Sequence, residues 1–133
     1  MRFKPSVSLA AMGIVAFALS AWAHHSHGNY ADTFMDIQGV VKEVHLVVPH
    51  SWVYLEVKNA KGEPEVWALE ATGRTGLERV GVTATTINVG DTIKARCHHL
   101  RDGSNGCLLG FLKAKDGTVK DWDGNSAPPP PDF

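Results

Sequence analysis

The sequence lacks the features that mark nucleic-acid-binding, membrane-spanning or recognisably catalytic proteins. It has no run of basic residues, and its 13 Lys and Arg are balanced by 14 Asp and Glu, so it offers no electrostatic footprint for nucleic acid. No second long apolar stretch follows the N-terminal one, which excludes an integral membrane domain. The motifs G-x-S-x-G, G-x-G-x-x-G and H-E-x-x-H and the phosphate-binding P-loop are absent. We therefore expect no nucleic-acid partner and no enzyme activity.

The first residues have the pattern of a secretory signal peptide. Met1-Arg2-Phe3-Lys4 is a cationic start, residues 7–18 are almost all apolar, and Ala21-Trp22-Ala23 places small residues before a cleavage point. We expect cleavage after Ala23 and export to the periplasm. The remaining chain of about 110 residues has the length of one ordinary domain.

Cysteine is scarce, with two residues in the whole chain. In an oxidising compartment Cys97 and Cys107 are expected to form a disulfide across a hairpin, which would stabilise the fold by roughly 2–3 kcal/mol. The alternative makes Cys97, Cys107, His98 and His99 soft ligands of a metal, although the C-x-x-C spacing of strong zinc sites is absent.

The pattern of apolar residues predicts an all-β domain. Strands are expected within residues 37–48, 52–58, 66–70, 92–97 and 107–114, with a short last strand at 119–122. Gly39 is a candidate bulge. One short helix is expected within residues 72–81, between the third and fourth strands. This order is that of a small five-stranded OB-like β-barrel, and a six-stranded sandwich fits it less well.

The expected domain organisation has four parts. Residues 1–23 are the signal peptide, 24–35 a histidine-rich N-terminal arm, 36–123 the barrel, and 124–133 a proline-rich tail that is expected to be disordered.

Histidine is the residue in surplus, with seven in the chain. After cleavage His24 carries the free α-amine, so that with His25 it offers nitrogen ligands suited to copper, or it is simply a solvated terminus. In an OB barrel the loops after the first and fourth strands share one end. His50, His98 and His99 are therefore expected there, as ligands of a transition metal, copper before zinc.

An aromatic set forms the second candidate site. Alternation places Trp52 and Tyr54 on one face of their strand, while Val53 and Leu55 face the core. A small-ligand pocket lined by Trp52, Tyr54, Trp67 and Glu70 is one interpretation, with sugars favoured over bases because positive charge is lacking. The other interpretation is that Pro49 and His50 make a turn and Trp52 packs on the barrel end.

Several motifs resemble those of a large family of small exported bacterial proteins with a domain of unknown function. Ala23-His24-His25-Ser26 looks like the family's first motif, residues 49–55 resemble its N-P-H-x-W-I-x-L motif, and Trp67-Ala68-Leu69-Glu70 resembles its W-x-L-E strand. The likeness spans roughly residues 23–122 and implies a periplasmic OB-like barrel without an established activity. Val48 departs from the family's Asn, and the cysteine pair and His98-His99 look like additions.

Together these observations predict an exported, non-enzymatic binding module for a metal or small ligand. Two alternatives stay open. One is an accessory subunit that contacts another periplasmic protein, and the other is a copper oxidase of the histidine-brace type, which requires cleavage directly before His24.

Overall fold

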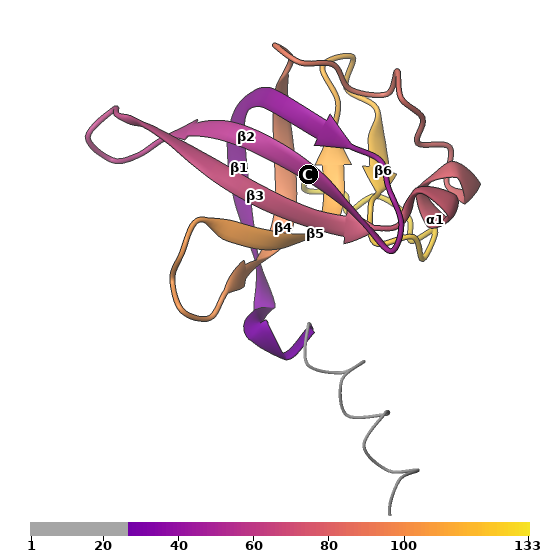
Figure 1. The fold of residues 1–133 in the computed structure, drawn as a ribbon, viewed down its shortest axis with the longest axis horizontal. Coiled ribbons are helices and arrows are strands. Elements are labelled where there is room, and N and C mark those ends of the chain that lie inside the picture. The colour runs from indigo at the N-terminus through magenta and orange to yellow at the C-terminus, as the bar shows by residue number, and fades with distance from the viewer. Residues whose placement is uncertain (1–26) are drawn as a thin grey trace, which may run out of the picture.

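A computed structural model describes residues 27–133, which form a small β-barrel (Figure 1). The expected signal peptide and the candidate ligands His24 and His25 lie outside the described residues. The elements in chain order are η1 (His27–Asn29), β1 (Tyr30–His45), β2 (His50–Lys58), β3 (Pro64–Thr72), α1 (Arg74–Arg79), β4 (Thr92–Leu100), β5 (Gly106–Lys113) and β6 (Val119–Asp121). None of the helices within residues 27–133 is long and apolar enough to cross a membrane.

The strand pairing confirms the predicted fold class. The sheet has the order β3-β2-β1-β4-β5-β6, and an additional pairing joins β3 to β5. That pairing is parallel, while the others are antiparallel, and it closes a ring of five strands. With α1 between β3 and β4, this is the OB arrangement. The short β6 adds to the edge of β5.

Strand β1 begins earlier than the sequence pattern indicates. Tyr30, Phe34 and Met35 pair with Leu100, His98 and Cys97 of β4, so residues 30–35 of the expected arm belong to the barrel. Because these residues are held in the sheet by pairing with β4, they form a strand without a regular alternation of apolar and polar residues. The register of β1 shifts between Val41 and Glu43 in its pairing with β2 and between Tyr30 and Phe34 in its pairing with β4, not at Gly39.

The core follows the alternation expected from the sequence. Val53 and Leu55 are fully buried, and the interior-facing residues of β3 and β4 pack against them. Cys97 and Cys107 are also fully buried and form the predicted disulfide, with their Cα atoms 5.7 Å apart. Cys97 pairs in register with Leu109, and Cys107 with His99, so the bridge joins β4 and β5 diagonally rather than directly across.

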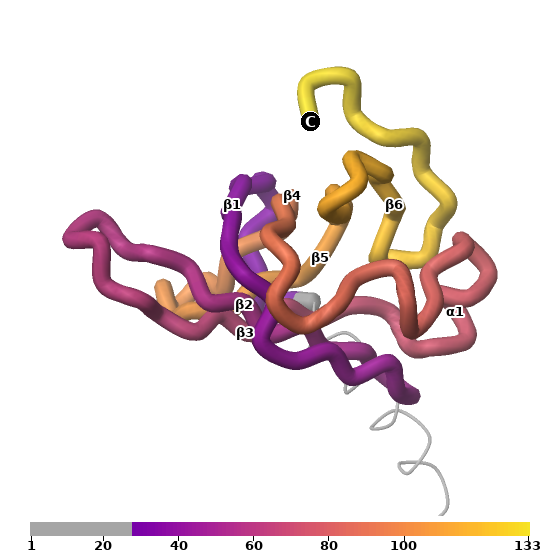
Figure 2. Tube along the Cα trace, turned by 90° about the horizontal axis from the view of Figure 1, so that it is seen from above, coloured from indigo at the N-terminus to yellow at the C-terminus, as the bar shows by residue number. Residues whose placement is uncertain are grey.

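The C-terminal residues, expected to form a disordered tail, contact the barrel in the structure. Asp132 forms an ion pair with Arg96 of β4 at 2.8 Å. The ring of Phe133 lies about 5 Å from the cationic groups of Lys94, Arg96 and Lys113. Figure 2 shows this segment, in yellow, arching away from β6 and returning toward β4 and β5. The prolines of this segment gave no indication of these contacts, because the contacts are made by Asp132 and Phe133.

The loops expected to share one end of the barrel do not do so. The β1–β2 loop lies beside α1, where the Arg74 N–H donates to the Val47 carbonyl at 3.0 Å. The β4–β5 loop lies against an earlier part of β3, where the Ala68 N–H donates to the Asn105 carbonyl at 3.1 Å. In addition, His50, His98 and His99 belong to strands rather than loops.

Candidate functional site

One row of side chains runs across five neighbouring strands on the outside of the barrel. Trp52 of β2 pairs with Glu70 of β3, Glu70 with Leu108 of β5, Leu108 with His98 of β4, and His98 with Phe34 of β1. Paired residues share a face of a sheet, and their chain neighbours Val53, Leu69, Cys107, Leu109 and Cys97 are buried in the core. This outer row therefore brings Trp52, Glu70 and His98, three predicted site residues, onto one surface.

Glu70 is the most confined charged group of the outer row, with only 8% of its surface exposed. Its Oε2 accepts a hydrogen bond from the hydroxyl of Tyr30 at 2.5 Å. Its Oε1 lies 3.4 Å from Nδ1 of His50. Burying a carboxylate is costly unless its oxygens are paired, so these two neighbours explain how Glu70 is accommodated.

The same contacts change the acidity of Tyr30. Burial, together with the hydrogen bond to Glu70 and the charge of that carboxylate, raises the pKa of the Tyr30 phenol well above its ordinary value. Tyr30 is therefore neutral over the whole physiological range and serves as a fixed hydrogen-bond donor.

His50 contacts the buried carboxylate of Glu70 on one side and the solvent on the other. Its side chain is 43% exposed, and Nδ1 is the ring nitrogen that faces Glu70. Within residues 27–133 no hydrogen bond engages its Nε2. An imidazole that is oriented by a carboxylate at one nitrogen can offer the other to a ligand hydroxyl or to a metal ion.

Trp52 and Tyr54 supply aromatic surface beside the carboxylate. Trp52 stands directly opposite Glu70, and Tyr54 lies opposite the small side chain of Ala68. Both aromatic residues are partly exposed. The ring of Tyr54 meets His45 edge-on, with 5.8 Å between centroids.

Trp67 does not join the predicted aromatic pocket. It pairs with Leu55 and belongs to the core, on the opposite side of the sheet from Trp52 and Tyr54. Its ring lies 5.2 Å from that of His99. Trp67 contributes to the stability of the barrel rather than to the outer face.

The structure does not bring His50, His98 and His99 together. His98 stacks on Phe34 with 4.2 Å between centroids, and its Nδ1 lies 3.2 Å from the Thr33 carbonyl oxygen. His99 Nε2 lies 2.9 Å from the Ser104 carbonyl oxygen. In the part of the chain that the structure describes, no three His, Cys, Asp or Glu residues are grouped so that they can hold a metal ion.

Sequence reasoning missed Tyr30 and placed it in the N-terminal arm. Forty positions separate it from Glu70, and β1 and β3 do not pair with each other. No local spacing signals such a contact. His45 lies within the strand predicted at residues 37–48 and ends β1, where its ring contacts Tyr54.

Comparisons with known proteins give a family and a fold. A family model described as a family of unknown function (DUF6152) matches residues 11–109. No curated protein matches the chain. Two crystal structures of the mitochondrial single-stranded DNA-binding protein Rim1 of S. cerevisiae are similar, with TM-scores of 0.48 and 0.45 and identities of 7% and 8%; each comparison covers 64% of this chain and 93% of the other. At these values the likeness supports no argument about function.

Proposed function

The chain belongs to DUF6152, a family of unknown function. We propose that it is a small non-enzymatic binding module exported to the periplasm. Export is supported by the cationic and apolar pattern of residues 1–23. The bond between Cys97 and Cys107 fits an oxidising compartment.

The proposed binding surface is the outer face of β2 and β3. The single observation that carries this proposal is the buried Glu70, held by Tyr30 and His50 next to the partly exposed ring of Trp52. An aromatic surface with a few fixed polar groups is typical of small-ligand sites, and the strands 2–3 face is where OB folds bind oligosaccharides and oligonucleotides.

The ligand class follows from the charges on this face. Glu56 is on the same face as Tyr54 and is paired with Lys42 at 3.6 Å, so the carboxylate of Glu70 is the charge that disfavours a phosphate-bearing ligand. A neutral, hydroxyl-rich ring can stack its C–H face on Trp52 while its hydroxyls bond to His50 and Glu70. We therefore propose an oligosaccharide-like ligand.

The test is calorimetric titration of the protein with gluco-oligosaccharides and N-acetylglucosamine oligosaccharides. Trp52→Ala should weaken binding roughly 5- to 150-fold, the range expected when an aromatic stacking platform is lost. Trp52→Phe should retain part of the affinity, and His50→Ala should weaken it. Val89→Ala, on an exposed residue of a distant loop, serves as the matched control. Failure of every oligosaccharide to bind, or equal binding by Trp52→Ala, would contradict the proposal.

A metal at His50 is the second candidate function. It is supported by the contact between His50 Nδ1 and Glu70, because metal-bound histidines commonly have a carboxylate behind the other ring nitrogen. Further ligands would have to come from residues such as His24 and His25, and copper suits nitrogen ligands of this kind.

Titration of the metal-stripped, processed protein with Cu(II) and Zn(II) tests this candidate. His50→Ala should weaken binding, whereas His99→Ala should not, because His99 is engaged with Ser104. Equal affinity of His50→Ala and the unmodified protein would exclude a metal at His50. N-terminal sequencing of the exported protein shows whether the chain starts at His24, without which a histidine brace cannot form.

A further inference from the structure

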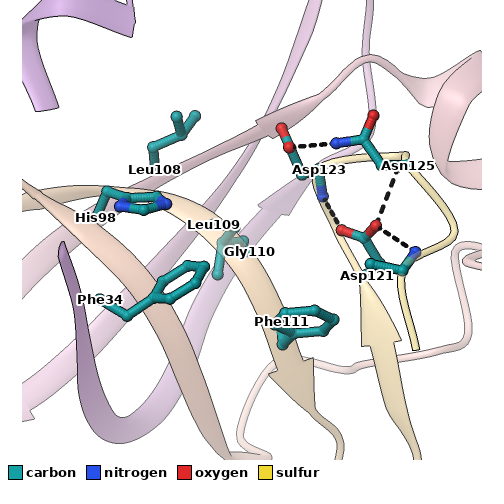
Figure 3. A pocket seen from close by; sticks show the side chains of 10 residues that line it. Phe34, His98, Leu108, Leu109, Gly110, Phe111, Asp121, Asp123 and Asn125 are labelled. Atoms are coloured by element: carbon teal, nitrogen blue, oxygen red, sulfur yellow. Dashed lines mark hydrogen bonds between the residues drawn. The ribbon is translucent and has the colours of Figure 1, made fainter. Parts of the chain in front are cut away.

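A cavity lies over the outside of β4, β5 and β6, at the other end of the outer row from Trp52 (Figure 3). Its volume is about 250 Å³. The residues that give it chemical character are Phe34, His98, Leu108, Phe111, Asp121 and Asp123. Pockets for drug-sized molecules begin near 300 Å³, so this cavity suits a smaller ligand.

Aromatic rings form one side of the cavity. Phe34 is 50% exposed, stacks on His98 and lies 6.4 Å from Phe111 between ring centroids, with the two phenyl planes tilted by 55°. Gly110 makes this arrangement possible, because a Cβ there would lie 2.7 Å from Cε1 of Phe34. The ring of Phe34 therefore rests directly on the backbone of β5.

Carboxylates form the facing side. Asp121 is 5% exposed, and its two oxygens accept hydrogen bonds from the backbone N–H groups of Asp123, Asn125 and Ala127 at 2.9–3.0 Å. Among the described residues no Lys, Arg or His forms an ion pair with Asp121. Asp123 stands beside it, its Oδ2 bonded to the side-chain amide of Asn125 at 2.6 Å.

The fixed position of Asp121 matters for what the cavity can hold. Its backbone hydrogen bonds hold the carboxylate in place, and no cationic side chain of the described residues pairs with it. The cavity thus combines ring faces, which attract cations, with a stationary negative charge. An anion is disfavoured by the carboxylates, and a metal ion lacks a group of three suitable ligands here.

We propose that this cavity binds a small organic cation, an ammonium group carrying methyl or short alkyl substituents. The alkyl groups contact Phe34 and Phe111, and the positive charge lies between the rings and Asp121. The site does not depend on the proposed oligosaccharide face. Trp52 and Phe34 are the two ends of the outer row, four strand pairings apart, so either proposal can be wrong while the other is right.

The test is calorimetric titration of the exported protein with choline and with tetramethylammonium, each as the chloride. Sodium chloride and 3,3-dimethyl-1-butanol, the uncharged counterpart of choline, are the ligand controls. We expect both organic cations to bind and the neutral alcohol to bind at least several-fold more weakly. Amide and aromatic NMR signals of Phe34, Gly110 and Phe111 should shift during the titration, and those of Trp52 should not.

Three variants separate the contributions to this site. Phe34→Leu keeps an apolar side chain but removes the ring, and should weaken binding roughly 2- to 30-fold, the range that cation–π contacts cover. Asp123→Asn keeps the shape of the loop and removes one charge, and should also weaken binding. Trp52→Ala should leave it unchanged.

Three results would overturn the proposal. They are the absence of binding by both organic cations, equal binding of the neutral alcohol, and full affinity in Phe34→Leu.

Discussion

The hydroxyl of Tyr30 donates a hydrogen bond to Oε2 of Glu70 at 2.5 Å, and so links the first residue of β1 to the second half of β3. The two strands do not pair with each other, so this contact ties together parts of the barrel that backbone hydrogen bonds leave separate. It also fixes the carboxylate that we place at the centre of the proposed ligand face.

The first prediction concerns ionisation of Tyr30. Because the chain has two tyrosines, the variant Tyr54→Phe leaves Tyr30 as the only phenol that can be observed by tyrosinate absorbance. We expect no ionisation of Tyr30 in the folded protein as the pH passes through about 10, the usual range of the phenol. Since the folded state holds the neutral form, its contribution to stability is complete below that pH and is lost as the pH rises further.

Glu70→Gln provides the control for this titration. It removes the negative charge and should lower the pKa of Tyr30, although burial, the largest cause of the shift, keeps that pKa above the ordinary value. A Tyr30 that ionises in its usual range while the protein stays folded would show that the contact with Glu70 does not form.

The second prediction concerns Gly39, which lies where β1 passes from pairing with β4 to pairing with β2. A Cβ at this position would lie only 2.4 Å from the Glu56 carbonyl oxygen, a backbone atom that cannot move without shifting β2. Gly39→Ala should lower the free energy of unfolding by roughly 1–3 kcal/mol, measured by denaturant titration. Gly28→Ala is the matched control, because nothing lies within 4 Å of its added Cβ, and it should change stability by less than about 0.5 kcal/mol.

The third prediction concerns the disulfide between β4 and β5. Reducing the bond between Cys97 and Cys107 should cost about 2–3 kcal/mol of unfolding free energy, because the bridge restricts the unfolded chain. The measurement compares denaturant midpoints with and without reductant. The variant in which both cysteines are replaced by Ala should not respond to reductant, and a wild-type protein that is equally insensitive would contradict the predicted contribution.

The fourth prediction concerns acid. Hydrogen bonds from Arg96 lower the pKa of Asp36 and of Asp132 below their usual values. The folded state therefore favours the ionised carboxylates, so their contribution to stability is present at neutral pH and is lost as the pH falls through the lowered pKa values. The difference in unfolding free energy between the wild type and Asp36→Asn should shrink below about pH 4. A difference that stays constant with pH would show that the charge of Asp36 does not contribute.

Features of the fold and of the site that depend on residues close together in the sequence could be predicted, whereas those that depend on contacts between distant segments could not. Alternation along β2 correctly assigned Val53 and Leu55 to the core, and the expected export together with the spacing correctly paired Cys97 with Cys107. The order of strands and helix was enough to predict the OB-like barrel. Each of these inferences rests on a local pattern or on topology.

The rest depended on contacts between distant segments. Tyr30 belongs to β1 because of β4, and Trp67 faces the core because its register places it opposite Leu55. The predicted grouping of His50, His98 and His99 assumed that the loops after the first and fourth strands lie at the same end of the barrel. In the structure His98 and His99 belong to strand β4 and not to the loop after it. The contacts of Asp132 and Phe133 with β4 likewise have no local signature.

The measurement that most directly tests the proposed ligand face is an NMR titration of the isotope-labelled protein with an oligosaccharide, following the indole N–H signals. The signal of Trp52, identified by its loss in Trp52→Phe, should shift in a saturable manner, whereas those of the buried Trp67 and Trp122 should stay in place. Saturable shifts that leave Trp52 unaffected, or no shift with any oligosaccharide tested, would contradict the account.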